Sequence, residues 1–340
     1  MHMKGGADMI DFSVIQKGKE FRILQLTDMQ VIDSTQKRFP ERLNAGETEK
    51  LQPQNMKEML FDSMDKLVAE TNPDLIIITG DIIYGEFDDT GKSLLAFIEK
   101  MESYNVPWAP VWGNHDNESV LGVDWQCQQF INAKNCLFKK GITVGCSNYT
   151  IGIKSSDGAL CRVMYMMDSN GCYNASKLSL LQGVRTDAGL VSQQLDWMRA
   201  SYANICKEYG NSVPSFVCFH IETIDYLQIL EQKGYYNPQA FCKYDIIQNG
   251  EDFGDIHETI CAGEYPISAL STFKAVNVDG AFFGHSHVNN ASIVSEGIRW
   301  TYGLKTGLYD YHEKEKLGGT LITLSNKCSQ FSVEHIRSFK

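Results

Sequence analysis

Short apolar runs alternate with longer amphipathic stretches along the first third of the chain. Residues 22–27 and 75–79 are rich in branched apolar side chains, which predicts two buried strands. Residues 54–70 and 91–104 place apolar side chains at helical spacing, and residues 108–112 form a third strand-like run. This alternation of strands and helices predicts an α/β fold in which helices cover a parallel sheet.

A similar pattern returns in the second half of the chain. Apolar positions in phase predict a helix over residues 192–209, and short apolar runs predict strands at 161–167, 215–219, 279–283, 299–303 and 319–324. Two long stretches, residues 117–150 and 221–275, show no strong strand pattern. Long segments between core strands are usually functional. We therefore predict one domain over residues 1–340 with these two insertions acting as a cap or lid.

The chain carries 42 acidic and 31 basic residues, so its formal net charge is −11. This charge repels nucleic acid and anionic lipid at long range, and no apolar run approaches the ~20 residues that a membrane helix needs. We expect neither a long nucleic acid partner nor a membrane span. The first residues contain no apolar signal core, which favours a cytoplasmic protein. An anionic substrate would need a local positive device, such as a bound metal.

The cysteines give little sign of a metal or redox site. There are ten of them, and none forms a CxxC pair, so a zinc knuckle or a thioredoxin-type site is not expected. Several, such as Cys218, lie inside apolar runs where a free thiol packs as a small hydrophobic group. We predict reduced thiols, and the alternative is a disulfide within the segment 127–146.

Residue types that bind metals follow five of the predicted strands. They are Asp28, Asp81, the run Asn114, His115 and Asp116, then His220, and finally His285 with His287. In an open α/β sheet, ligands bind beyond the carboxyl ends of the strands. One Asp after a strand is usually a turn former, but turn chemistry does not explain five such ends.

These residue types suit a pair of divalent metal ions. Asp28 and Asp81 supply two negative charges, the histidines supply neutral nitrogens, and Asn114 supplies an amide oxygen. Two metal ions ~3.5–4 Å apart share a bridging carboxylate and clamp both oxygens of an in-line displacement. Two dications against two carboxylates leave a small cationic hole in an acidic protein, which suits a phosphorylated substrate.

The order of these motifs is Asp-x-x, Gly-Asp, Gly-Asn-His-Asp, His and Gly-His-x-His, and it resembles that of the calcineurin-like metallophosphoesterases over residues 22–310. The segments GDIIY at 80–84 and VCFH at 217–220 also resemble motifs of the purple acid phosphatases. The segments GHSHVNN at 284–290 and YGLKTG at 302–307 resemble a smaller branch related to those phosphatases. The resemblance implies a four-layer α/β/β/α sandwich with the metal site at the carboxyl ends of the strands.

The resemblance also implies a role for each motif residue. Metal one would be held by Asp28, Asp81 and His287. Metal two would be held by Asp81, Asn114, His220 and His285, so that Asp81 bridges the two ions. His115 would hydrogen-bond the phosphoryl group and protonate the leaving oxygen, and Asp116 would orient the His115 ring.

Two positions leave the identity of the metals open. The first motif is normally Asp-x-His or Asp-x-Gly, but Gln30 stands at its third place. A glutamine carbonyl can bind a hard metal, so Gln30 is a candidate ligand. Tyr84 occupies the place of the iron-binding phenolate of the purple acid phosphatases, and as a ligand it would favour iron(III) at metal one. Gln30 without Tyr84 favours manganese, zinc or iron(II), and we favour this colourless form with two divalent ions.

We predict a phosphomonoesterase in which a metal-bridging hydroxide attacks phosphorus in line, without a phosphoenzyme, and His115 acts as the general acid. One alternative is a phosphodiesterase that takes a cyclic nucleotide or a lipid head group at the same site. The other is a metal-bound scaffold protein without catalysis. The natural substrate and the oligomeric state do not follow from the sequence.

Specificity should reside in residues 117–150 and 221–275, the second of which includes Asp225, Tyr226, Tyr235, Tyr236 and His257. His257 is a weaker candidate for a contact with substrate. So are three cations after the first motif, Lys37, Arg38 and Arg42. Asp168 follows another strand, and we expect it to have a structural, hydrogen-bonding role.

Overall fold

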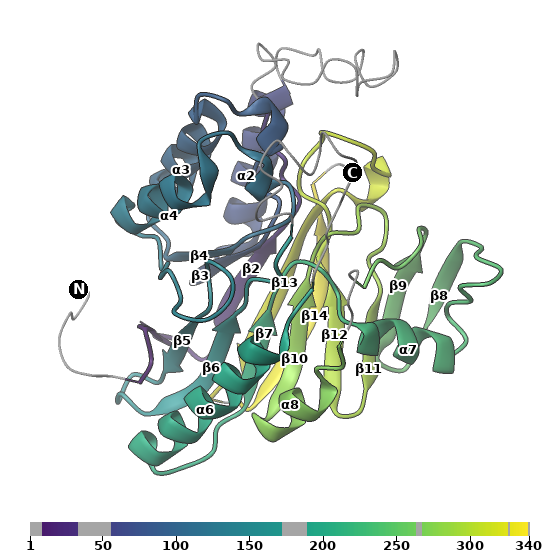
Figure 1. Cartoon of the computed structure of the whole chain (residues 1–340). Helices are drawn as coiled ribbons and strands as arrows, with labels where there is room; N and C mark the ends of the chain where they lie inside the picture. The colour runs from purple at the N-terminus through teal and green to yellow at the C-terminus, as the bar shows by residue number, and fades with distance from the viewer. Residues whose placement is uncertain (1–8, 33–55, 172–188, 263–266, 326, 339–340) are drawn as a thin grey trace.

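Two β-sheets and six α-helices make up the computed structural model, which describes residues 9–32, 56–171, 189–262, 267–325 and 327–338 (Figure 1). The strands of the first sheet are β1 (Phe12–Ile15), β5 (Tyr149–Lys154), β6 (Leu160–Met166), β7 (Ser215–Cys218), β8 (Tyr244–Asn249), β9 (Asp252–Ile256), β10 (Val278–Phe283), β11 (Ser292–Ser295) and β12 (Ile298–Tyr302). Those of the second are β2 (Phe21–Leu26), β3 (Leu75–Thr79), β4 (Trp108–Val111), β13 (Gly318–Ser325) and β14 (Gln330–Arg337). The helices are α2 (Met56–Thr71), α3 (Lys92–Ser103), α4 (Gly122–Asn132), α6 (Ser192–Tyr209), α7 (Ile224–Gln232) and α8 (Leu270–Ala275).

The first sheet has nine strands in the order β1-β5-β6-β7-β10-β12-β11-β9-β8, and the second has five in the order β14-β13-β2-β3-β4. The predicted parallel pairing is confirmed for β2, β3 and β4 and for the centre of the larger sheet, where β6, β7, β10 and β12 run parallel. The outer strands add antiparallel pairs, such as β13 with β2 and β11 with β12. The carboxyl ends of the parallel strands therefore meet at one edge of each sheet.

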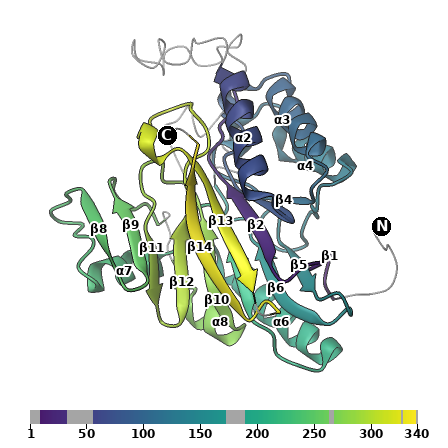
Figure 2. The same cartoon turned by 180° about the vertical axis from the view of Figure 1, so that it is seen from behind.

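Successive residues of the central strand β7 belong to two different hydrophobic cores, because strand side chains alternate between faces. Phe216 and Cys218 share a core with residues of the smaller sheet such as Ile322. Val217 shares a core with side chains of α6, α7 and α8, among them Met198. Helices α2, α3 and α4 lie outside the smaller sheet, while α6 and α8 lie outside the larger one, as Figures 1 and 2 show from opposite sides. The arrangement is the predicted four-layer α/β/β/α sandwich.

The two stretches without a strand pattern contain regular structure that the sequence analysis missed. Residues 117–150 include α4 and the start of β5, and residues 221–275 include α7, the antiparallel pair β8 and β9, and α8. Strand β9 also pairs with β11, so the second segment extends the edge of the larger sheet. Edge strands bury only part of each face, which leaves a weak apolar pattern.

The nine cysteines among the described residues are free thiols, as predicted. They include the three of the segment 127–146. Within the described ranges, no helix is both long and apolar enough to cross a membrane. The predicted cations Lys37, Arg38 and Arg42 lie outside the described residues.

Candidate metal centre

The turns that follow β2, β3 and β10 have unusual backbone conformations. Asp28, Gln30, Asp81 and His285 all have positive φ angles, of 52°, 47°, 50° and 74°. Such conformations cost of order 1–3 kcal/mol for residues other than glycine, and they cluster at functional sites. Position 113, next to these turns, has room only for glycine, because a Cβ atom there would lie 2.1 Å from the Asp81 Oδ1 atom. The strand ends are thus packed closely enough to bring the motif side chains together.

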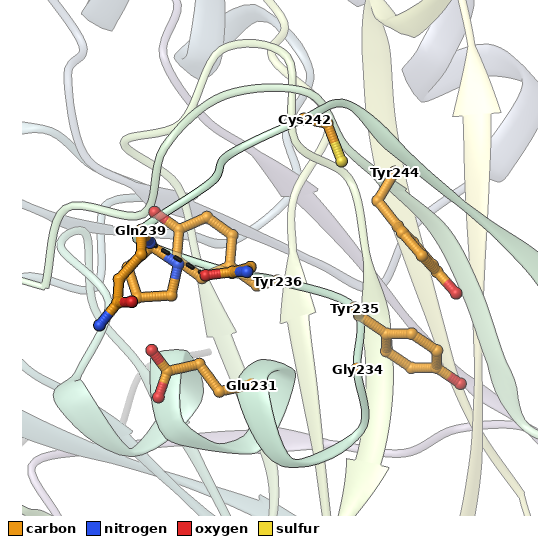
Figure 3. A pocket seen from close by; sticks show the side chains of 9 residues that line it. Glu231, Gly234, Tyr235, Tyr236, Gln239, Cys242 and Tyr244 are labelled. Carbon is orange, nitrogen blue, oxygen red and sulfur yellow. Dashed lines mark hydrogen bonds between the residues drawn. The ribbon is translucent and has the colours of Figure 1, made fainter.

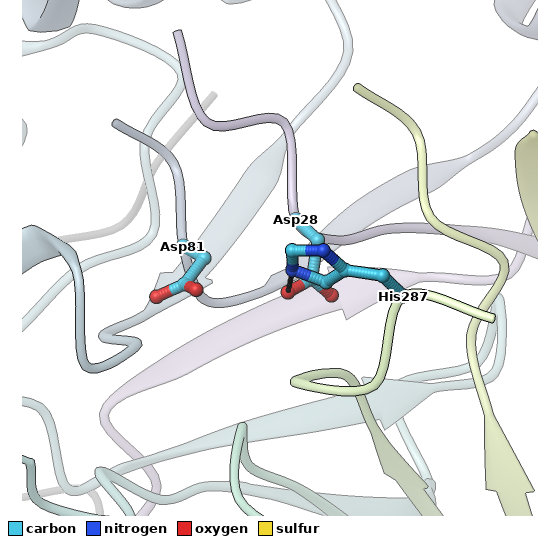
Figure 4. A group of neighbouring side chains, drawn as sticks. All are labelled: Asp28, Asp81 and His287. Atoms are coloured by element: carbon cyan, nitrogen blue, oxygen red, sulfur yellow. Dashed lines mark ion pairs between the residues drawn. The ribbon is translucent and has the colours of Figure 1, made fainter. Parts of the chain in front are cut away.

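Asp28, Asp81 and His287 form one buried group, in which each residue offers a ligand atom within 4.8 Å of the others (Figure 4). The Asp28 Oδ2 atom accepts hydrogen bonds from the Thr27 hydroxyl at 2.8 Å and from the His285 amide at 3.1 Å. The Asp28 Oδ1 atom is buried and accepts no hydrogen bond from the described residues, and it lies 3.6 Å from the His287 Nε2 atom. A buried carboxylate oxygen without a partner is costly, and a cation bound between these three residues would satisfy it.

A second group shares Asp81. The His220 Nε2 atom lies 3.4 Å from Asp81 Oδ1 and 3.1 Å from the Asn114 Oδ1 atom. The His220 Nδ1 atom donates to the Thr79 carbonyl at 2.7 Å, which points Nε2 into the site. The His285 ring packs edge-on against the His220 ring at a centroid distance of 5.1 Å. The four residues expected at metal two therefore lie together, and their oxygen and nitrogen atoms suit a divalent ion.

The charges of the site are balanced within the protein itself. Burial raises the pKa of Asp28 to about 6. Burial also acts to raise the pKa of Asp81, but His220 and His115 hold it below its ordinary value. Burial acts to lower the pKa of His220, but Asp81 outweighs it and raises this pKa to about 10. A metal ion would replace this histidine proton, because only the neutral imidazole binds metals.

His115 lies beside Asp81, but its ring is not held by the residue that the sequence suggested. The His115 Nδ1 atom lies 2.8 Å from the Glu118 Oε2 atom, and the ring stacks on that of Tyr84 at 4.3 Å between centroids. The expectation for Asp116 is wrong. Both its oxygens accept backbone hydrogen bonds, from the amides of residues 82, 83 and 113, at 2.9, 3.0 and 2.8 Å.

Gln30 lies next to the first group with its oxygen turned away from the ligands. The Gln30 Oε1 atom accepts from the Lys305 ammonium at 2.6 Å, and its Nε2 atom lies 3.3 Å from the His287 Nε2 atom. Lys305 is buried and also donates to the Asp28 carbonyl at 3.0 Å. The sequence gives no sign of this burial, since most lysines are exposed.

The cleft over these residues has a volume of about 280 Å³. Besides the candidate metal ligands Asp81, Asn114, His285 and His287, it is lined by Tyr84, His115, Glu222, Glu258, Thr259, Cys261, Ser286, Asp310 and Tyr311. Glu258 and Tyr311 had no signal in the sequence. Glu258 accepts from the His287 and Val288 amides at 2.6 and 3.0 Å, from the Ser286 hydroxyl and from the Tyr311 hydroxyl. Tyr311 packs against the His287 ring at 4.3 Å.

The weaker candidates have structural roles among the described residues. His257 lies 2.7 Å from carboxylate oxygens of both Asp245 and Glu313, and it does not line the cleft. Asp168 accepts from the amides of Cys146 and Asn170, which confirms its predicted hydrogen-bonding role.

A larger, open hollow of about 610 Å³ lies between α7 and β8, and it is lined by residues of the segment 231–244 (Figure 3). Tyr235, Tyr236 and Tyr244 form much of its wall. The Tyr236 hydroxyl accepts from the Ile260 amide at 3.2 Å, and Ile260 stands between two residues of the cleft wall, Thr259 and Cys261. This hydrogen bond connects the wall of the hollow to the wall of the cleft.

Comparison with known proteins agrees with the motifs. A sequence model of the family described as calcineurin-like phosphoesterase matches residues 21–289. The "probable inactive purple acid phosphatase 28" of Arabidopsis thaliana is 27% identical over 264 residues, which are 73% of this chain and 61% of that protein. "Probable inactive purple acid phosphatase 29" of the same plant is 23% identical over 318 residues, 88% of this chain and 74% of that protein. The "phosphatase DCR2" of Saccharomyces cerevisiae is 27% identical over 237 residues, 64% of this chain and 36% of that protein.

Two solved structures are similar at low identity. A dimetal phosphatase from Danio rerio is 12% identical with a TM-score of 0.49, and the match covers 93% of this chain and 98% of that one. The purple acid phosphatase PPD1 from yellow lupin, Lupinus luteus, is 12% identical with a TM-score of 0.49, and the match covers 95% of this chain and 52% of that one.

Proposed function

The chain belongs to the calcineurin-like phosphoesterase family, and on that premise we propose that it hydrolyses a small phosphomonoester at a binuclear metal centre. One observation carries the proposal. Asp81 is buried between two groups of ligand atoms, with His287 and Asp28 on one side and His220 on the other. A carboxylate in that position suits the bridge between two divalent ions.

Metal one would be held by Asp28, Asp81 and His287, and metal two by Asp81, Asn114, His220 and His285. When bound, two such ions supply an activated water and neutralise the phosphoryl oxygens. The protein's own part is to hold the ligands rigidly. The Thr27 hydroxyl and the His285 amide fix the Asp28 carboxylate, and the Thr79 carbonyl fixes the His220 ring.

His115 is the proposed general acid. Its Nδ1 atom lies 2.8 Å from the Glu118 Oε2 atom, and we assign to this ring the proton that the leaving oxygen of the ester takes up. The Glu118 carboxylate stabilises the protonated ring, and the stacked Tyr84 ring limits its rotation. His115 lies in the lining of the cleft, as a group that contacts substrate must.

The names of the relatives point in two directions, since two are called probable inactive and one is called a phosphatase. The presence of His115 and of the whole ligand set supports catalysis over a scaffold role. A phosphodiesterase on the same site is the second enzymatic candidate. The described cleft lining contains no lysine or arginine, which argues against a long polyanionic substrate such as a nucleic acid.

The experiment compares p-nitrophenyl phosphate with bis-p-nitrophenyl phosphate after loading with manganese, zinc or iron. We expect faster hydrolysis of the monoester. His115→Ala should lower turnover by ~10²–10⁴-fold with both metals retained, and by less for esters with good leaving groups. Asp81→Asn should lose both ions together. Two bound ions without hydrolysis of either ester would support the scaffold, and faster cleavage of the diester would support the phosphodiesterase.

We also propose that residues 221–275 act as the cap within a single domain and select the substrate. Glu222, Glu258, Thr259 and Cys261 from this segment line the cleft, which supports the assignment. Shortening the loop 233–243, which lines the outer hollow, should change the ranking of alkyl and aryl phosphates with both metals bound. An unchanged ranking would move recognition to residues 117–150.

The metal identity follows from Tyr84 in this proposal. The Tyr84 ring stacks on His115, the proposed general acid, and we assign it that role in place of a metal ligand. Without a phenolate ligand, the site suits two divalent ions, and the enzyme would be colourless. Aerobic purification from iron-supplemented cells tests this. A visible absorption band that disappears in Tyr84→Phe would instead make Tyr84 a ligand of iron(III).

A further inference from the structure

Lys305 is a buried ammonium at the edge of the proposed metal-one site. Its side chain comes from the turn after β12, is 1% exposed and donates to two oxygens, the Asp28 carbonyl at 3.0 Å and Gln30 Oε1 at 2.6 Å. A buried charge is costly unless it is well paired. Both acceptors are therefore needed by Lys305, and the Gln30 oxygen is held firmly.

This contact fixes which way the Gln30 amide faces. An ammonium group only donates hydrogen bonds, so the amide oxygen must point at Lys305 and the amide nitrogen at the other side. There the nitrogen lies 3.3 Å from His287 Nε2. The His287 Nδ1 atom lies 3.1 Å from the Tyr311 carbonyl, to which it donates, so Nε2 carries the lone pair and accepts from Gln30. The contacts at both ends of the amide agree on one orientation.

We propose that Lys305 keeps the Gln30 carbonyl out of metal coordination, so that Gln30 presents an N–H donor to the metal-one site. This inference rests on the proposed function. Metal one would then have only Asp28, Asp81 and His287 as side-chain ligands, which would leave room beside it for water and a phosphoryl oxygen. The Gln30 N–H group lies beside the His287 Nε2 atom, so it would donate to such an oxygen once the metal takes the Nε2 lone pair.

The same lysine bears on the charge of the ion. Lys305 places its ammonium group beside Asp28, at the site that would hold the first metal. A like charge disfavours a trivalent ion more than a divalent one. Lys305 therefore selects divalent metals at this site, independently of the part that Tyr84 plays.

The test is a cycle of Gln30→Leu, Lys305→Met and the double variant, with Mn²⁺ binding measured by calorimetry and folding checked by thermal unfolding. The binding step that His287→Ala abolishes identifies metal one. Gln30→Leu should change the metal-one affinity by less than about threefold. Lys305→Met should tighten it by about tenfold or more, because it frees the carbonyl and removes a charge, and part of this gain should be lost in the double variant.

Lys100→Met is the control. Lys100 is a half-buried lysine of α3 that pairs with Asp65 of α2, and it does not touch Gln30 or the turn that carries His287. It should leave the metal-one affinity within about threefold of the wild type. A loss of tenfold or more in Gln30→Leu alone would make Gln30 a ligand and overturn the inference, whether or not Lys305→Met folds. Wild-type protein that binds no ion would overturn the proposed function and this inference together.

Discussion

Glu258 links the proposed cap to the turn that carries His287, and its removal is expected to weaken ion binding at the proposed metal-one site. Its Oε1 atom accepts from the Ser286 hydroxyl and from the His287 and Val288 amides, and its Oε2 atom accepts from the Tyr311 hydroxyl at 2.6 Å. One carboxylate therefore holds the whole turn that carries His287. It also holds Tyr311, whose ring and carbonyl both contact His287.

Glu258→Ala removes four hydrogen bonds at once. Hydrogen bonds to a charged group contribute about 1.5–3 kcal/mol each, but Glu258 is only half-buried, so water replaces part of the loss. We expect the metal-free protein to lose about 2–4 kcal/mol of unfolding free energy. Substituting groups that orient metal ligands typically costs 10- to 100-fold in affinity, and the same is expected for Mn²⁺ at metal one.

Glu258→Gln keeps the size and shape of the side chain and removes its charge. The amide oxygen can still accept from the His287 and Val288 amides, and the amide nitrogen can donate to the Tyr311 oxygen, so the affinity should fall by less than about tenfold. The assays are Mn²⁺ calorimetry and urea unfolding of the metal-free protein. Glu231→Ala is the control, because Glu231 is exposed in the same cap segment and lines only the outer hollow. An affinity of Glu258→Ala within twofold of the wild type would refute the reasoning.

Three further predictions concern residues whose contacts are equally specific. Glu118→Gln should lower turnover of an alkyl phosphate by roughly 10- to 100-fold with both metals bound, since the His115 ring loses its anionic partner; unchanged turnover would remove Glu118 from the mechanism. Burial lowers the pKa of His335 from 6.5 to about 4. As the pH falls from 6.5 to 4, the unfolded chain therefore takes up a proton before the folded chain does, and the free energy of unfolding drops by up to about 3 kcal/mol. In urea unfolding, His335→Gln should lack that part of the pH dependence. Asp279→Ala should cost about 3–5 kcal/mol of unfolding free energy because it leaves the fully buried Arg162 guanidinium without its carboxylate; a loss under 1 kcal/mol in chemical denaturation would contradict this.

The motif residues could be located from the sequence because each follows a strand that is itself easy to recognise. The run 75–79 is apolar at four of its five positions and is buried throughout, and it ends directly before Gly80 and Asp81. Parallel strands bring their carboxyl ends to one edge, so residues distant in sequence meet without any further signal. The grouping of Asp28, Asp81 and His287 follows from this rule together with the resemblance.

The elements and contacts that the sequence did not predict depend on partners far along the chain. Strand β14 alternates between exposed and partly buried positions, and its register is fixed by pairing with β13. In the sequence, Glu258 has the pattern of a surface residue, because nothing indicates that the turn 286–288 packs against it. Lys305 likewise reads as a surface cation, and only the fold shows that the Asp28 carbonyl and the Gln30 side chain enclose its ammonium.

Asp116 shows why the residue next to a proposed general acid need not assist its chemistry. Its side chain is short and fully buried, and it reaches the amides of residues 82 and 83 after β3 as well as that of Gly113 after β4. It thereby ties together the two turns that carry Asp81 and Asn114. Glu118 lies in the 3₁₀ turn 116–118, which brings residue i+3 back beside residue i, and its longer side chain meets the His115 ring. The residues of the motif Gly-Asn-His-Asp therefore have two different roles. Asn114 and His115 face the cleft, whereas Gly113 and Asp116 set the distance between the strand ends.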